Sequence, residues 1–188
     1  VEDNAGNATV LSSPLLVVDA KQPAAPTVSM ETIGTSDKVD ATGTTLNVSE
    51  SKVTNWTNQN VKVTLSGSEK DKDGEDLKAG LDHYEYRTAT TQAGLTSETW
   101  TAVGENYKAT ETTPNTFVIT APSNGRSTNY YEIRAISRTG VEGASVIYQV
   151  RQDTITPATP SLTIDGKPIN QTEKYNASEA TIAYAQKD

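Results

Sequence analysis

Short stretches of alternating apolar and polar residues recur along this chain of 188 residues. The clearest runs from Asn60 to Ser66, where Val61, Val63 and Leu65 take every second position and therefore share one face of an extended strand. The same period of two recurs in four later segments, at Tyr84 and Tyr86, at Phe117 and Ile119, at Tyr131, Ile133 and Ala135, and at Val146, Tyr148 and Val150. With strands at Thr27–Met30 and after Trp100, about seven short strands separated by turn-forming residues are predicted, which is typical of a β-sandwich.

One segment of the chain returns at a fixed distance. Asp19-Ala-Lys-Gln-Pro-Ala-Ala-Pro26 is echoed by Asp153-Thr-Ile-Thr-Pro-Ala-Thr-Pro160, a shift of 134 residues. The echo continues without a gap, since Thr27-Val-Ser29 falls on Ser161-Leu-Thr163. Self-similarity at a fixed period is the mark of a tandem array, here with a period the size of a domain.

A second match locates the opening strands of a further repeat. Tyr175–Tyr184 aligns with Trp56–Leu65 at an offset of 119 residues, so the later repeat has a shorter first loop. We therefore predict the C-terminal strands of a preceding repeat plus a linker in residues 1–22, a complete sandwich repeat in 23–155, and the N-terminal strands of a following repeat in 156–188. Because Pro23 and Pro26 lie on either side of the Ala24–Ala25 pair, the stretch Ala20–Ala25 is expected to be a short, semi-stiff connector.

Composition narrows the function classes. Only 34% of the residues are hydrophobic, which suits a thin two-layer β domain in which every second side chain faces water. A net charge of -8 argues against nucleic acid as a partner, because phosphates would be repelled. No stretch approaches the roughly 18 consecutive apolar residues of a membrane-spanning helix, so no membrane insertion is expected in this segment. The chain has no cysteine, which excludes disulfides and thiolate metal sites.

The order of several motifs carries a resemblance. Trp56-Thr-Asn-Gln-Asn-Val-Lys-Val-Thr-Leu65, Gly80-Leu-Asp-His-Tyr-Glu-Tyr-Arg87, Trp100 and Tyr131-Glu-Ile-Arg-Ala-Ile-Ser-Arg-Thr-Gly140 together resemble the tandem bacterial immunoglobulin-like domains of large cell-surface and secreted proteins. Asp3-Asn-Ala-Gly-Asn7 is similar to the turn that precedes the last strand of such domains.

This resemblance implies an all-β, immunoglobulin-like β-sandwich repeat with partial flanking repeats. It also implies an extracellular setting, on a bacterial cell surface or in a secreted protein. The implied role is a structural spacer or stalk, with neighbouring repeats of the same protein as partners, and fold alone does not decide among such roles. Two alternatives stay open: adhesion to host or cell-wall glycans or proteins, and an accessory domain of a secreted polysaccharide-degrading enzyme.

Candidate chemistry is sparse. His83 is the only histidine and no serine lies in a nucleophile-elbow pattern, so we expect no catalytic residues, no cofactor and no enzyme activity. Trp100 and Tyr84 are the candidate contacts for a carbohydrate or another ligand, with core packing as the competing interpretation for Trp100. Trp56 is expected in the core, as a large side chain at the beginning of a strand.

Calcium is the one metal that the sequence brings into question. Asp71–Asp76 carries part of the oxygen-ligand spacing of a calcium loop, but a charged, solvated turn is the preferred interpretation. Calcium-dependent adhesin repeats that resemble this chain place carboxylates near the linker, which makes Asp3, Asn4, Asn7 and Asp19 the implied ligands at the first junction. The second junction keeps Asp153 but has Arg138 and Val141 in matching places. We expect no calcium dependence at either junction.

Overall fold

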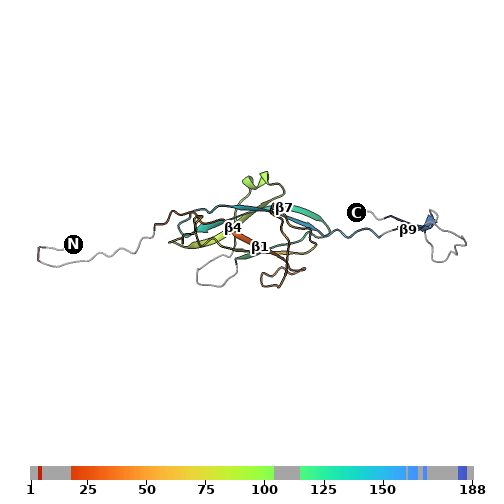
Figure 1. The fold of residues 1–188 in the computed structure, drawn as a ribbon, viewed down its shortest axis with the longest axis horizontal. Coiled ribbons are helices and arrows are strands. Elements are labelled where there is room, and N and C mark those ends of the chain that lie inside the picture. Colours follow the sequence, from red (N-terminus) through yellow and green to blue (C-terminus); the bar gives the residue numbers. More distant parts are fainter. Residues whose placement is uncertain are drawn as a thin grey trace.

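Two antiparallel four-stranded sheets form the central part of the computed structural model, which describes residues 4–5, 18–103, 115–159, 161–164, 167–168 and 182–185. The first sheet has the order β2-β1-β3-β6 and contains β1 (Thr27–Thr32), β2 (Thr44–Thr45), β3 (Val61–Ser66) and β6 (Thr116–Ile119). The second has the order β5-β4-β7-β8 and contains β4 (Leu81–Ala89), β5 (Thr101–Val103), β7 (Arg126–Ser137) and β8 (Val146–Asp153). The predicted all-β sandwich is thereby confirmed (Figure 1).

The core lies between the two sheets and is built by the alternating positions. Both sheets contribute fully buried side chains, such as Val61 and Val63 from β3 and Ile133 from β7. Across the layers, the rings of Tyr86 and Phe117 stack with centroids 4.2 Å apart. Of the thirteen side chains at the alternating positions predicted to share inward faces, ten are buried, and the other three, Tyr86, Val146 and Tyr148, are partly buried against the same core.

A segment outside both sheets covers the outer side of β8. Residues 52–57 run parallel to this strand, with bridges from Val53 to Gln149 and from Thr57 to Gln152. The hydroxyl of the fully buried Thr54 accepts a hydrogen bond from the Arg151 amide at 3.0 Å, while the Arg151 guanidinium donates to the carbonyl of Thr54. An otherwise open sheet edge is therefore protected.

The chain enters and leaves the sandwich at opposite ends (Figure 1). Asp19 contacts Thr139, just beyond the C-terminal end of β7, whereas Asp153 pairs with Arg126 at the beginning of that strand. β7 contains twelve residues, which at about 3.3 Å each span roughly 40 Å. The sandwich therefore separates its two junctions by nearly the full length of its longest strand.

A third, three-stranded sheet follows, with the order β10-β9-β11. It contains β9 (Ser161–Ile164), β10 (Lys167–Pro168) and β11 (Ile182–Ala185). Its register copies that of the first sheet: Ile164 faces Ile182 as Met30 faces Val63, and Ser161 faces Ala185 as Thr27 faces Ser66. These pairs differ by the same offsets, 134 and 119 residues, that relate the segments in sequence.

The turn at Asn4–Ala5 has a counterpart at Arg138–Thr139, again 134 residues later. Most of residues 1–22, predicted to hold the C-terminal strands of a preceding repeat plus a linker, lies outside the described residues, and Val18 is exposed. Within the described ranges, no helix is long and apolar enough to cross a bilayer.

One prediction about the core is wrong. Trp56 is 47% exposed and does not plug the beginning of β3. Its ring lies instead beside the guanidinium groups of Arg126 and Arg151, at 5.3 and 5.4 Å from the ring centroid. The reason is that residues 52–57 run along β8 outside the sheets, which carries Trp56 away from the space between them.

Candidate functional site

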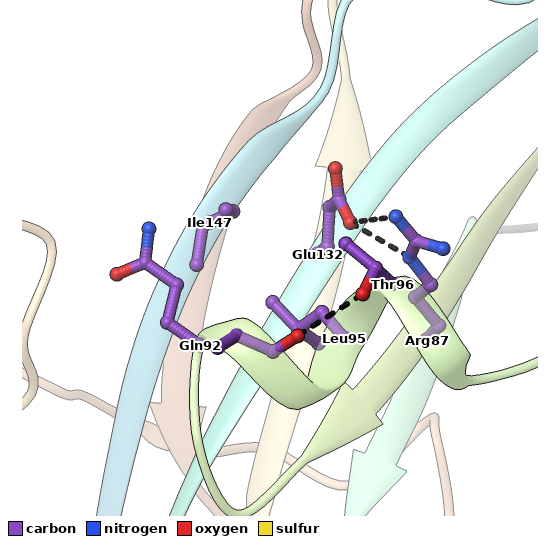
Figure 2. A pocket seen from close by; sticks show the side chains of 7 residues that line it. Arg87, Gln92, Leu95, Thr96, Glu132 and Ile147 are labelled. Carbon is purple, nitrogen blue, oxygen red and sulfur yellow. Dashed lines mark hydrogen bonds and ion pairs between the residues drawn. The ribbon is translucent and has the colours of Figure 1, made fainter.

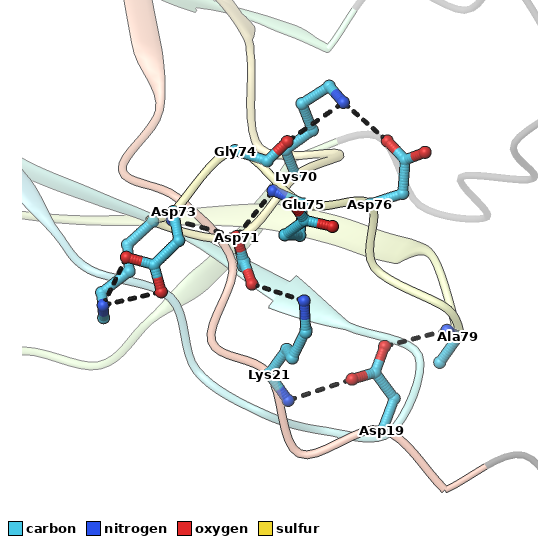
Figure 3. A network of polar contacts seen from close by, with 10 residues as sticks. Asp19, Lys21, Lys70, Asp71, Asp73, Gly74, Glu75, Asp76 and Ala79 are labelled. Atoms are coloured by element: carbon cyan, nitrogen blue, oxygen red, sulfur yellow. Dashed lines mark hydrogen bonds and ion pairs between the residues drawn. The ribbon is translucent and has the colours of Figure 1, made fainter.

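Asp19 is the residue through which the chain joins the sandwich (Figure 3). Its Oδ1 accepts the N–H of Lys21 and its Oδ2 accepts the N–H of Ala79, both at 3.0 Å. The Thr139 hydroxyl donates to the Asp19 carbonyl at 2.7 Å, so the residue is held from two loops and is only 8% exposed. The N–H groups of Ala79 and Lys21 lower the pKa of the Asp19 carboxyl below its ordinary value, because they bind its charged form.

Asp71 organises the turn next to this attachment. Its Oδ1 accepts the N–H groups of Asp73 and Glu75, both at 2.9 Å, and its Oδ2 lies 2.9 Å from the ammonium of Lys21 (Figure 3). The Lys21 ammonium first, and then the N–H of Glu75, lower the pKa of Asp71 to about 2. The acidic segment 71–76 is thus a turn closed by its own first carboxylate.

The stretch Ala20–Ala25, expected to be a short, semi-stiff connector, packs on the sandwich. Pro23 is fully buried and its carbonyl accepts the N–H of Ala144 at 3.3 Å. The Ala24 N–H donates to the carbonyl of Lys70 at 2.8 Å, and the Gln22 side-chain amide donates to the carbonyl of Glu142. The segment packs on the sandwich because its main-chain groups form hydrogen bonds there and the ring of Pro23 is buried.

The residues implied for calcium at the first junction have different placements. Asn4 lies in an exposed turn, and Asp3 and Asn7 lie outside the described residues. Both carboxylate oxygens of Asp19 already accept backbone N–H groups. In the part of the chain that the structure describes, no group of three or more acidic, histidine or cysteine side chains could hold a metal ion.

Asp153 occupies the corresponding place where the chain leaves the sandwich. Its Oδ1 accepts the N–H of Ile155 at 3.0 Å, and its Oδ2 accepts Nε and Nη2 of Arg126 at 2.8 and 2.6 Å. Its own N–H donates to the carbonyl of Thr57 at 2.9 Å. The Ile155 N–H and the Arg126 guanidinium lower the pKa of the Asp153 carboxyl.

Trp100 lies on the outer face of the second sheet, over a row of charged side chains. The guanidinium carbons of Arg87 and Arg134 are 4.5 and 4.0 Å from its ring centroid. These arginines pair with Glu132 and Glu85 on the neighbouring strand. Trp100 is half-buried by this packing, so its ring is engaged by cations of its own sheet.

β4 places Tyr84 and His83 on opposite faces of the sheet. Tyr84 is 0% exposed and its hydroxyl accepts the N–H of Ser68 at 3.3 Å, which confirms its predicted inward direction. A buried ring cannot contact a ligand at the surface, so the candidate role of Tyr84 in binding is not supported by its position. His83 points outward, with Nδ1 2.7 Å from Asp82.

The second sheet also has a hollow on its outer face that the alternation pattern did not reveal (Figure 2). A 3₁₀ helix, η1 (Ala93–Ser97), covers part of this face and buries Leu95 against it. The hollow beside it has a volume of about 460 Å³ and is lined by Arg87, Gln92, Ala93, Leu95, Thr96, Glu132 and Ile147. An adjoining hollow of about 300 Å³ shares Gln92 and Ile147 and adds Ser51, Lys52, Val53, Tyr130 and Gln149.

Comparisons with protein-family models, with curated proteins and with solved structures find no match to this chain.

Proposed function

We propose that this chain is a segment of a tandem array of immunoglobulin-like repeats that acts as a non-catalytic spacer. The array forms a semi-rigid stalk on a bacterial cell surface or in a secreted protein and projects functional domains away from their anchor. Neighbouring repeats of the same protein are its partners.

The repeat character rests on the third sheet. Four consecutive pairs, from Ser161–Ala185 to Ile164–Ile182, have the register of the pairs from Thr27–Ser66 to Met30–Val63. A slip of one residue would turn every side chain of a strand to the opposite face, so an identical register is a specific likeness between two strand pairs. This coincidence is the single observation that best supports a second copy of the same fold.

The spacer character rests on the positions of the two junctions. Asp19 and Asp153 lie at opposite ends of β7, so each added repeat moves the chain forward by roughly 40 Å, the length of twelve extended residues. The connecting segment at residues 19–24 is bonded to the sandwich instead of being free, which limits bending between units. Stacked units of this kind make a rod.

The proposed extracellular setting agrees with the surface of the protein. A net charge of -8 makes neighbouring rods repel one another and keeps them soluble, and it disfavours nucleic acid as a partner. A domain without cysteine folds independently of the redox state of its surroundings.

Small-angle scattering tests this proposal directly. In a lengthened protein, residues 1–152 are followed by residues 19–188, so that the central repeat occurs twice in register. The maximum dimension should grow by roughly 40 Å, the length of one sandwich. An increase in the maximum dimension no larger than that of a compact globule of the same mass would overturn the spacer function.

Binding of a glycan in the paired hollows is the second candidate. It is favoured by neutral hydrogen-bonding groups, Gln92 and Gln149, beside the ring of Tyr130 and the apolar side chain of Ile147. Such a mixture suits a neutral sugar, whose hydroxyls need donors and acceptors and whose ring faces are apolar. A glycan screen that compares the Ile147→Asp and Val39→Asp variants tests this candidate. Ile147 lines both hollows, so its variant should lose glycan binding, whereas Val39 is an exposed residue outside both linings and serves as the control.

A further inference from the structure

Asp19 and Asp153 are the same residue of the repeat, and they adopt the same local structure. They are 134 residues apart, and each accepts on Oδ1 the N–H of the residue two positions later, at 3.0 Å in both cases. This turn leaves Oδ2, the main-chain N–H and the main-chain carbonyl free to make contacts further away.

The distant contacts of the two residues are complementary. Asp19 binds the sandwich that follows it, through Oδ2 to the Ala79 N–H and through its carbonyl to the Thr139 hydroxyl. Asp153 binds the sandwich that precedes it, through Oδ2 to the Arg126 guanidinium and through its N–H to the Thr57 carbonyl. Only Oδ2 is used in both directions.

We propose that this aspartate is a two-sided clasp that binds two consecutive repeats to each other, with a second copy of the repeat as the partner on its free side. At a complete junction its N–H binds the preceding repeat, its carbonyl binds the following repeat, and Oδ2 accepts a hydrogen bond from each. The two oxygens of a carboxylate offer about four lone-pair sites, enough for the local amide, the amide of the following repeat and the two guanidinium N–H groups of Arg126. The inference rests on the proposed spacer function and gives its junction a specific structure.

The clasp explains how successive repeats could be held without a metal ion. The guanidinium of Arg126 supplies the positive charge that a carboxylate needs when two domains exclude water around it. The shared residue has partners at both ends of its main chain, so rotation about its backbone would break bonds to one repeat or the other. The hydrogen bonds of this one residue thereby fix the angle between neighbouring repeats.

The segment after Asp153 is exposed, as expected where the aspartate contacts the preceding repeat alone. Pro157 is exposed, whereas Pro23, its counterpart 134 residues earlier, is fully buried. Pro23 is covered by parts of the sandwich that lie up to about 120 residues further on. A complete following repeat would cover Pro157 in the same way.

Distance measurements in the lengthened protein described above, in which residues 1–152 are followed by residues 19–188, test the clasp. The cysteine-free chain allows specific spin labels at Ser29→Cys, an exposed position on β1, in both copies of the repeat. Double electron–electron resonance should give a narrow distribution of distances between the two spin labels. The distribution should broaden with Arg126→Met in the first copy, which removes the guanidinium bonds to Oδ2 and leaves the bond to the Thr57 carbonyl in place. It should also broaden with Asp19→Ala in the second copy.

The matched control is Asp73→Ala in the second copy, an acidic side chain in the segment between β3 and β4 that lies 65% in solvent, and it should leave the width unchanged. If the distribution stays equally narrow in both the Arg126 and the Asp19 variants, the clasp is refuted while the spacer function stands. If the starting protein gives a broad distribution, the clasp is refuted as well. If its mean distance is much shorter than one sandwich, the spacer function fails too.

Discussion

The ammonium of Lys21 lies 2.9 Å from the carboxylate of Asp71, which joins the beginning of the repeat to the turn between β3 and β4. The Asp71 side chain is only 7% exposed and also accepts two backbone N–H groups. A residue that looks like part of an exposed linker in the sequence thus stabilises a turn 50 residues further along the chain.

This pair predicts how the protein responds to acid. The pKa of Asp71 is lowered from 3.8 to about 2 in the folded state, so its charged form favours folding above pH 4. That contribution is lost as the pH falls from about 4 towards about 2. Asp71→Asn should lower the melting temperature at pH 7 and flatten its decline across that acid range, as measured by circular dichroism.

Asp73→Asn is the matched control, because Asp73 pairs with Lys72 on the same turn but both side chains are mostly exposed. Exposed ion pairs contribute little to stability, so this variant should melt as the starting protein does. Parallel acid limbs for Asp71→Asn and the starting protein would contradict the assigned role of Asp71.

Pro23→Gly should destabilise the sandwich by about 1–3 kcal/mol, because it removes a buried ring and gives the unfolded chain more freedom. Pro157→Gly, the same change at the matching exposed position, should alter the free energy of unfolding by about 0.5 kcal/mol or less. Urea titrations of the two variants compare them. Equal effects would show that the burial of Pro23 makes no contribution to stability.

Ile133→Ala should cost about 2–5 kcal/mol, because Ile133 is 0% exposed at the centre of the core on β7. Ile155→Ala removes the same atoms from a side chain that is 49% exposed, and its effect should stay within about 0.5 kcal/mol. Denaturant unfolding monitored by fluorescence measures both. A small effect of Ile133→Ala on the free energy of unfolding would contradict the assignment of this residue to the core.

The two tryptophans should differ in their access to solvent. In Trp100→Phe the remaining Trp56 is exposed beside two arginines, so iodide should quench its emission strongly. In Trp56→Phe the remaining Trp100 is half-buried under Arg87 and Arg134, and quenching should be weaker. Neutral acrylamide serves as the control for the attraction of the anion by arginine, and the same order of quenching by acrylamide is expected. The reverse order would contradict the placement of both rings.

Alternation predicts the longer strands of the two sheets and most of the side chains between them. A period of two is a local property, and burial on one face follows from it directly, as at Val61, Val63 and Leu65. The sequence offsets also carried over into the register of β9 and β11. Both successes depend on backbone geometry that neighbouring residues determine.

Trp56 and Pro23 show where the same reasoning stops. Each lies just outside a strand, where periodicity says nothing about direction, and their surroundings come from distant segments. Arg126 and Arg151 surround Trp56, and Ala144 contacts the segment at Pro23. The sequence pattern does not predict the 3₁₀ helix η1, because five residues are too few for a helical period to appear.

The protection of β8 on both of its sides has a mechanical consequence. The chain leaves the sandwich at the C-terminal end of this strand, so a pull beyond Asp153 acts along the strand axis. Hydrogen bonds to β7 on one side, and to residues 52–57 on the other, are then loaded together and in shear, instead of opening one after another. Residues 52–57, which belong to neither sheet, thereby add tensile strength to the sandwich.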